Sequence, residues 1–183
     1  VVKGGREFKA VQTGGPSGGC LTSKHLDTQI DYDRLVAAGS MMGSGGMVVM
    51  DETSCMVAIA KFYLEFTCEE SCGKCSPCRI GNKRMLEILT KITEGNGTMD
   101  DLQELRNLAA VIKDAALCGL GQTSPNPVLS TLDNFWDEYV EHVVDKKCRA
   151  GVCKKLMSYE IDKAKCIGCG KCAKNCPAEA ISK

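Results

Sequence analysis

The first fifty residues carry short strand-like patterns rather than long helical ones. Residues 7–13 alternate and end at a glycine-rich run, 14–19, while an apolar run at 47–50 follows a second group of glycines. Alternation and short apolar runs bounded by glycine are typical of strands, and the second run indicates a buried one. With a short helical pattern at 31–38, these features predict a small α+β unit.

The run Gly14-Gly15-Pro16-Ser17-Gly18-Gly19 invites comparison with a phosphate-binding loop. No Gly-Lys-Ser/Thr follows it, and it lacks an evident strand–loop–helix context. Tight turns that need positive φ are therefore the favoured interpretation.

From residue 53 onward, apolar residues recur at helical spacing. Helices are predicted at 54–67, 77–94 and 99–116, with a fourth after residue 127. Ser76 before Pro77 predicts a capped start, and Thr98 with Asp101 forms an acidic variant of the capping box. The apolar residues line one face of each predicted helix, and these faces predict the core of a four-helix bundle. Its candidates include Val111 in the third helix and, in the fourth, Leu129, Leu132, Phe135, Trp136, Tyr139, Val140 and Val143.

Charge and cysteine content limit the classes of function that this chain could have. Lys and Arg together number 23, as do Asp and Glu, so charge gives no reason to expect nucleic acid or membrane insertion. The chain has thirteen cysteines, which would suit a secreted disulfide scaffold. The count is odd, however, and seven lie in two tight C-x-x-C series, which favours a reduced, cytoplasmic, metal-bound protein. Because the chain opens on Val1 and stops soon after Cys176, we interpret it as a piece of something longer.

Cys72, Cys75 and Cys78 form one C-x-x-C series, and helix lengths connect it to Cys118. The second and third predicted helices are each about 27 Å long at 1.5 Å per residue, so an antiparallel pair returns Cys118 beside Cys78. Four thiolates suit a zinc ion as well as an iron–sulfur cluster. The compact arc of three cysteines at the start of a helix favours [4Fe–4S].

Cys166, Cys169, Cys172 and Cys176-Pro177 form the second series. It matches the bacterial ferredoxin run C-x2-C-x2-C-x3-C-P, in which the fourth cysteine ligates the other cluster of a pair. We therefore expect Cys166, Cys169 and Cys172 to ligate one [4Fe–4S] cluster, and Cys176 to ligate a cluster that a twin segment would complete. A treble-clef-like zinc site is the alternative.

The segment Glu70-Ser71-Cys72-Gly73-Lys74-Cys75-Ser76-Pro77-Cys78-Arg79, with Cys118-Gly119-Leu120-Gly121 downstream, resembles the C-terminal part of the NADH-binding flavoprotein subunit of complex I. The resemblance covers about the first 145 residues. It implies that Cys72, Cys75, Cys78 and Cys118 hold a [4Fe–4S] cluster and that the first fifty residues form a β-grasp domain. The family's flavin and nicotinamide domain has no counterpart here, so FMN and NAD(P) are expected only outside this segment. The ferredoxin extension is similar to hydrogenase beta subunits, including electron-bifurcating ones.

His142, Cys148 and Cys153 lie between the two modules. They could hold a structural zinc, with a fourth ligand from a missing tail or another subunit; the alternative is two linker thiols and a histidine on a helix face. Cys20, Cys55 and Cys68 lack such context and are expected to be small buried apolar residues.

These features predict an α+β chain of four parts: a β-grasp-like unit (1–52), a helical bundle with a [4Fe–4S] cluster (53–145), a linker with the candidate zinc site (146–160) and an incomplete ferredoxin-like arm (161–183). We expect an electron-transfer segment of a flavin- and NAD(P)-dependent oxidoreductase, with other iron–sulfur subunits as partners. No carboxylate pair or Cys/His nucleophile indicates a catalytic residue. The competing hypothesis is a non-catalytic zinc-binding assembly module.

Overall fold

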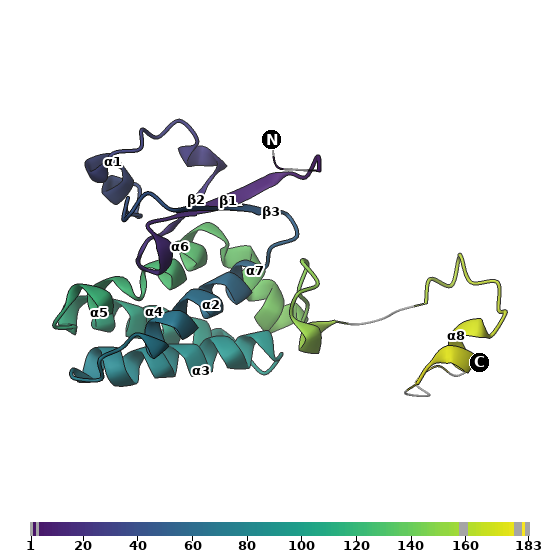
Figure 1. The fold of residues 1–183 in the computed structure, drawn as a ribbon. Helices are drawn as coiled ribbons and strands as arrows, with labels where there is room; N and C mark the ends of the chain where they lie inside the picture. The colour runs from purple at the N-terminus through teal and green to yellow at the C-terminus, as the bar shows by residue number, and fades with distance from the viewer. Residues whose placement is uncertain (1, 3, 158–160, 178–180, 182–183) are drawn as a thin grey trace.

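The computed structural model describes residues 2, 4–157, 161–177 and 181. A small antiparallel sheet lies against one side of a larger group of helices (Figure 1). Its strands are β1 (Phe8–Thr13), β2 (Cys20–Thr22) and β3 (Met47–Asp51), in the order β2-β1-β3. The mixed helix-and-sheet class expected from the sequence is confirmed.

The predicted strands at 7–13 and 47–50 are present, but the second one is not buried as expected. Met47, Val48 and Val49 are each about half exposed, and only Met50 is buried. The reason is that β3 lies at an edge of the sheet. Met50 packs with Ala10, Cys20 and Met56 in a small core of its own between the sheet and the helices.

The glycine-rich run folds as a tight turn. Gly14 and Gly15 have φ of 72° and 63° and lead into the 3-10 turn η1 (Gly15–Ser17). At Gly18 an added Cβ would lie 1.7 Å from the carbonyl oxygen of Thr13, so the turn admits no side chain there. A second 3-10 turn, η2 (Ser23–His25), and the short helix α1 (Tyr32–Ala37) complete this part of the chain.

The helical part begins with α2 (Met56–Glu69). A π-helical turn, η3 (Pro77–Gly81), continues directly into α3 (Asn82–Thr93), and α4 (Met99–Ala115) runs back beside it. The chain continues through α5 (Gly119–Thr123), α6 (Asn126–Asn134), α7 (Trp136–Val140), the π-helical turn η4 (Glu141–Asp145) and the 3-10 turn η5 (Lys154–Leu156). The shared core draws on α2, α3, α4 and α6, with members that include Leu64, Met85, Leu89, Ile92, Leu102, Leu105, Ala109, Ile112, Val128 and Leu132.

The fourth predicted helix is broken, which the apolar pattern did not indicate. Phe135 has φ −134° and ψ 37°, outside the helical region, and separates α6 from α7. The change of direction leaves Trp136 40% exposed, so its assignment to the core was wrong, as was that of Val111 at 59%. Tyr139 is fully buried, as predicted.

The helix-start predictions had mixed outcomes. Thr98 and Asp101 form the predicted capping box at the start of α4. Ser76 makes no capping hydrogen bond, because its own backbone is already helical at φ −60° and ψ −40°.

The described residues 161–177 contain one short helix, α8 (Lys171–Asn175), and none of them belongs to the hydrophobic core. The predicted linker and ferredoxin-like segments also include residues 158–160, 178–180 and 182–183, which lie outside the described residues. Within the described part of the chain, we find no helix with the length and apolar character needed to cross a membrane.

Candidate metal centres

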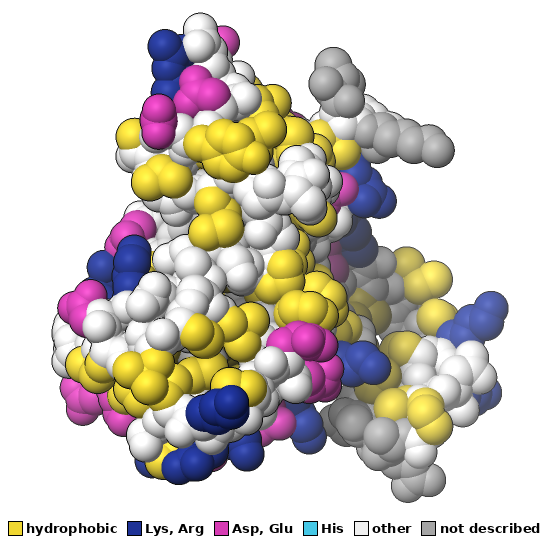
Figure 2. Space-filling model, turned by 60° about the vertical axis from the view of Figure 1, so that its left-hand side comes forward, with side chains coloured by type: hydrophobic (Ala, Val, Ile, Leu, Met, Phe, Trp, Pro, Cys, Tyr) yellow, Lys and Arg dark blue, Asp and Glu magenta, His cyan; other side chains and the backbone are white. Residues whose placement is uncertain are grey.

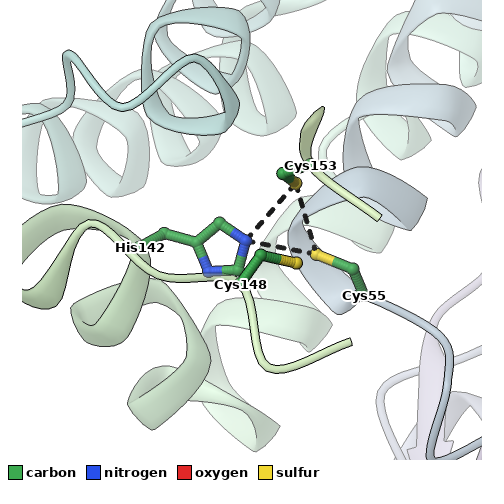
Figure 3. A group of neighbouring side chains, drawn as sticks. All are labelled: Cys55, His142, Cys148 and Cys153. Carbon is green, nitrogen blue, oxygen red and sulfur yellow. Dashed lines mark hydrogen bonds between the residues drawn. The ribbon is translucent and has the colours of Figure 1, made fainter. Parts of the chain in front are cut away.

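Cys55, His142, Cys148 and Cys153 form a buried cluster of soft ligands (Figure 3). Their donor atoms all lie within 4.8 Å of one another, and no other set of three or more His, Cys, Asp or Glu among the described residues meets that condition. The Cys55 sulfur is 3.3 Å from His142 Nε2 and 3.8 Å from the Cys153 sulfur, and Cys153 is 3.5 Å from the same imidazole nitrogen.

Three separate elements bring these side chains together. Cys55 is the residue before α2, directly after the turn that follows β3, and His142 lies in the π-helical turn η4. The chain then reverses at Lys146, whose φ is 52°, and again at Gly151, whose φ is 64°. The two reversals return Cys148 and Cys153 to the imidazole.

These distances fit one tetrahedral ion. Zinc–sulfur and zinc–nitrogen bonds of about 2.3 and 2.05 Å imply edges of roughly 3.8 Å between two sulfurs and roughly 3.6 Å between sulfur and nitrogen. His142 Nδ1 donates to the backbone carbonyl of Glu138 at 2.7 Å, which leaves Nε2 facing the thiols. Hydrogen bonding with Cys153 and burial raise the pKa of Cys55 to about 12, so metal binding would displace a proton from it.

The fourth member of this cluster corrects the sequence analysis. We expected a fourth ligand from outside the segment and treated Cys55 as an apolar residue. Cys55 is indeed buried, at 2% exposure, but its sulfur contacts His142 and Cys153. It lies 87 residues before His142, so no local spacing connects the two.

The first C-x-x-C series lies at the surface near the start of η3. Cys78 is buried, Cys75 is partly exposed, and Cys72 and Cys118 are exposed. The chain around Cys118 lies against the series, as the equal helix lengths predicted. The backbone N–H groups of Leu117 and Cys78 donate to Cys75 and lower the pKa of its thiol.

Backbone donors directed at sulfur and the approach of α5 both suit a cluster held by thiolates. An added Cβ on Gly121 would lie 3.2 Å from Cys78 Cβ and 3.7 Å from its sulfur, so the first turn of α5 packs directly on Cys78. Lys74 and Arg79 are exposed beside the series, and Arg79 Nη1 donates to Gly73 O at 3.0 Å. Their positive charge would favour an anionic cluster.

In the second series, Cys166 and Cys169 precede α8, Cys172 lies within it and Cys176 directly follows it. Cys166, Cys169 and Cys172 are exposed and Cys176 is partly exposed. Gly168 and Gly170, with φ of 70° and 67°, turn the chain between the first three cysteines. Among the described residues, which include all thirteen cysteines, no disulfide is formed.

Both series lie in segments that match known protein families. Residues 58–142 match the family model of the NADH-ubiquinone oxidoreductase-F iron–sulfur binding region, and residues 159–182 match that of the 4Fe-4S binding domain. Over residues 58–142, the chain is therefore similar to the NADH-ubiquinone oxidoreductase-F iron–sulfur binding region. All four cysteines of the first set lie within the first match, and all four of the second series lie within the second. Neither match supports a zinc module as the role of the two series.

Individual relatives agree with this result. The chain is 64% identical over 178 residues to the NADP-reducing hydrogenase subunit HndC of Solidesulfovibrio fructosivorans, covering 97% of this chain and 36% of HndC. It is 39% identical over 144 residues to an NADH-quinone oxidoreductase subunit of Streptomyces coelicolor, covering 79% of this chain and 32% of that relative. The chain thus spans about a third of the length of these relatives.

A crystal structure of an NAD+-reducing [NiFe]-hydrogenase in the H2-reduced state has the same fold over much of the chain. The TM-score is 0.64 with 29% sequence identity, and the alignment covers 75% of this chain and 24% of that one. The iron–sulfur binding region therefore lies in a fold that hydrogenase subunits share.

Proposed function

We propose that this chain is the iron–sulfur electron-transfer segment of an NAD(P)-linked oxidoreductase of the hydrogenase or complex I type. The observation that carries the proposal is the match of residues 58–142 to an iron–sulfur binding region, a segment that contains Cys72, Cys75, Cys78 and Cys118. Electrons from a flavin would enter the first site and pass to other clusters. FMN and NAD(P) would be bound by other parts of the parent enzyme, which is placed in the cytoplasm, where thiols stay reduced.

Each cysteine series is assigned one [4Fe–4S] cluster. The first would be held by Cys72, Cys75, Cys78 and Cys118. The second would be held by Cys166, Cys169 and Cys172, with Cys176 as a ligand toward a further cluster. In this assignment, residues 1–52 are a β-grasp-like domain, 53–145 a four-helix bundle, 146–160 a linker and 161–183 a ferredoxin-like arm.

The surface around the first series fits a redox partner. Leu117 is 82% exposed and Ile80 is 51% exposed, and both adjoin the cysteines. Figure 2 turns the α5 side of the molecule forward and shows apolar and Lys/Arg side chains together on its lower part. An apolar surface beside a cluster site suits close docking of another iron–sulfur subunit.

Cys55, His142, Cys148 and Cys153 would hold one structural zinc ion. The support is a buried set of four donors whose ligand atoms all lie within 4.8 Å of one another, which leaves no open position for a substrate. Such an ion would link the start of α2 to the chain that leaves η4, just before the ferredoxin-like arm.

Anaerobic iron and acid-labile sulfide analysis, with EPR of the reduced protein, tests the electron-transfer role. The expected result is iron and sulfide at cluster stoichiometry, with the first cluster lost in Cys118→Ser and retained in Cys20→Ser. Cys20 is a matched control because it is buried and belongs to neither series. A colourless, EPR-silent protein that contains only zinc would overturn the proposal.

Elemental analysis of the same preparations tests the zinc site separately. We expect one zinc per chain, lost in Cys55→Ser with the iron content unchanged. Zinc retained at full occupancy in Cys55→Ser would remove Cys55 from the site.

A further inference from the structure

Cys78 differs from the other cysteines of the first series in its polar neighbours. Its side chain is only 4% exposed, yet two polar side chains contact its sulfur. Asn82 Nδ2 lies 3.4 Å from Cys78 Sγ, and Ser71 Oγ lies 3.2 Å from it. Asn82 stands one turn after Cys78, at the junction of η3 and α3, so the helix itself aims the amide at the sulfur.

A third residue fixes the orientation of that amide. Ser124 Oγ lies 2.8 Å from Asn82 Oδ1, and both residues are 1% exposed. A metal-bound thiolate can only accept hydrogen bonds. If the Asn82 amide were flipped, its oxygen would face the Cys78 sulfur, and two acceptors would lie against each other. Ser124 Oγ also lies 2.9 Å from the carbonyl oxygen of Gly121, but the hydroxyl has a single proton. With the thiolate accepting from Nδ2, Oδ1 faces Ser124 and takes that proton. Ser124 comes from the end of α5, 42 residues away, so the arrangement depends on the tertiary fold.

Ser71 is oriented in a similar way. The backbone N–H of Gly73 donates to Ser71 Oγ at 3.3 Å, which uses one lone pair of the hydroxyl and leaves its proton free for Cys78 Sγ. Cys78 therefore receives one N–H and one O–H donor from side chains.

We propose that Asn82 and Ser71 tune the reduction potential of the first cluster by donating hydrogen bonds to Cys78 Sγ, with Ser124 as the residue that positions Asn82. The inference rests on the proposed [4Fe–4S] ligation by Cys78. One electron entering the site adds one unit of negative charge, and hydrogen bonds to a charged acceptor are stronger than those to a neutral one. The donors thus stabilise the reduced state more than the oxidised state, which raises the potential.

The ordinary alternative is that Asn82 and Ser124 only link η3 to α5 as a satisfied buried pair. A merely structural pair would affect stability and leave the potential unchanged. The potential therefore separates the two roles.

The test is an EPR-monitored redox titration of the full chain in a Cys166→Ser/Cys169→Ser background, so that only the first site contributes. Asn82→Leu keeps the side-chain shape and removes the donor. We expect it to lower the potential by an amount near a tenfold change in the ratio of oxidised to reduced cluster, about 59 mV for one electron. Ser71→Ala and Ser124→Ala should shift it in the same direction.

Ser130→Ala is the matched control, because Ser130 is a partly buried serine that bonds to Cys20 N and not to the cysteine series. It should leave the potential unchanged. An unchanged potential in Asn82→Leu at full iron and sulfide content would overturn the inference. If Asn82→Leu does not fold, unchanged potentials in both Ser71→Ala and Ser124→Ala would overturn it instead. Absence of a cluster from the parent chain would refute the proposed function and the tuning role together, whereas an unchanged potential at full cluster content refutes the tuning role alone.

Discussion

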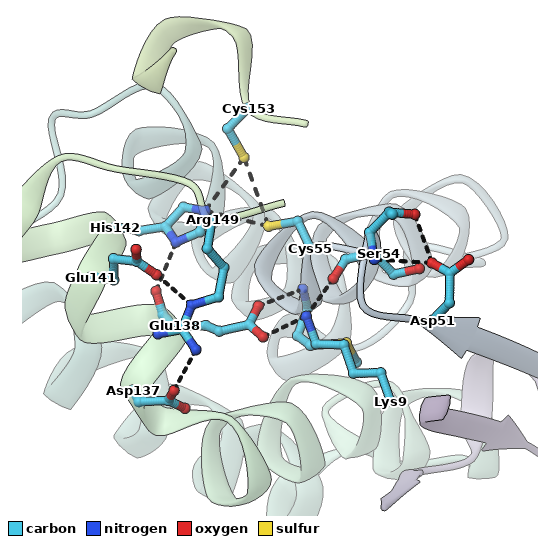
Figure 4. Close-up of polar contacts among 12 residues, drawn as sticks. Lys9, Asp51, Ser54, Cys55, Asp137, Glu138, Glu141, His142, Arg149 and Cys153 are labelled. Atoms are coloured by element: carbon cyan, nitrogen blue, oxygen red, sulfur yellow. Dashed lines mark hydrogen bonds and ion pairs between the residues drawn. The ribbon is translucent and has the colours of Figure 1, made fainter. Parts of the chain in front are cut away.

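Lys9 and Glu138 form a buried ion pair that joins the sheet to the helices, with Lys9 Nζ 2.5 Å from Glu138 Oε1 (Figure 4). Their side chains are 12% and 2% exposed. Lys9 Nζ also donates to the carbonyl of Ser54, and Glu138 Oε2 accepts the backbone N–H of Met56 at 3.2 Å. The pair thus binds the backbone on both sides of Cys55, and the Glu138 carbonyl accepts a hydrogen bond that orients the His142 ring. One ion pair therefore supports two members of the candidate zinc site.

Glu138→Gln is expected to destabilise the chain by about 3–5 kcal/mol, because it leaves the Lys9 ammonium buried without its counter-charge. Asp133→Asn is the control. Asp133 pairs with Arg106 at the surface, where the side chains are 57% and 40% exposed, and such pairs contribute about 1 kcal/mol or less. The free energy of unfolding in urea measures both. Equal losses in the two variants would mean that the Lys9–Glu138 pair has no special role.

The capping box at the start of α4 gives a second prediction. Thr98 Oγ1 accepts the backbone N–H of Asp101 at 3.3 Å, and Asp101 Oδ2 accepts that of Thr98 at 2.7 Å. Thr98→Ala should cost about 1 kcal/mol of unfolding free energy. Thr123→Ala should cost less, since Thr123 bonds only to carbonyls of its own helix. A Thr98→Ala loss no greater than that of Thr123→Ala would contradict the role of the cap.

The contribution of the Asp101 carboxylate to stability depends on pH. Burial raises the pKa of Asp101, but hydrogen bonds from Lys91 and Thr98 outweigh burial and lower the pKa below its ordinary value of 3.8. The stabilising contribution of the Asp101 carboxylate is thus fully present above the pKa that this group has in the unfolded chain. The contribution is lost as the pH falls through the lower pKa that the group has in the folded chain. The stability difference between the parent chain and Asp101→Asn, measured without bound metals, should shrink over that range of pH and remain constant between pH about 5 and 7.

Cysteine reactivity in the apo protein follows from local environment. Burial raises the pKa of Cys20 to about 12, whereas backbone donors lower that of Cys75. Only the thiolate reacts with iodoacetamide. Mass spectrometry after brief treatment at pH 8 should find Cys75 modified and Cys20 protected, and urea should abolish the difference. Between pH about 9 and 12, the folded state keeps the Cys20 proton and the unfolded state loses it. The contribution of Cys20 to stability is therefore lost as the pH rises through this range. Modification of Cys20 as fast as Cys75 in the native protein would refute the assignment.

Features determined by neighbouring residues could be predicted from the sequence. The end of α3 near Gly95, whose φ is 84°, and the Thr98 cap are local, and both lie where the pattern placed them. The cysteine spacings are local too, and they indicated the iron–sulfur region that comparison with known proteins supports.

Features determined by tertiary packing could not be predicted in the same way. The break at Phe135 interrupts an apolar pattern that would suit a continuous helix, because α7 turns to present Glu138 to Lys9. Cys55 joins His142 only after the sheet and the helices have packed, so its role had no signal in spacing. Three-residue strands such as β2 are too short to show alternation.

Gly121→Ala tests whether the contact between α5 and η3 shapes the first cluster site. The new Cβ would lie 2.6 Å from Ala116 Cβ and 3.2 Å from Cys78 Cβ, so α5 must move away from the cysteine series. We expect a loss of about 1–3 kcal/mol in stability from overpacking, together with reduced iron and sulfide content. Gly119→Ala is a close control, since it places the same methyl group in the same helix with nothing within 4 Å. It should retain the cluster and be as stable as the parent or more so, because alanine favours helix over glycine. If Gly121→Ala instead retained full cluster content while Gly119→Ala lost it, packing on Cys78 could not be what holds the site in shape.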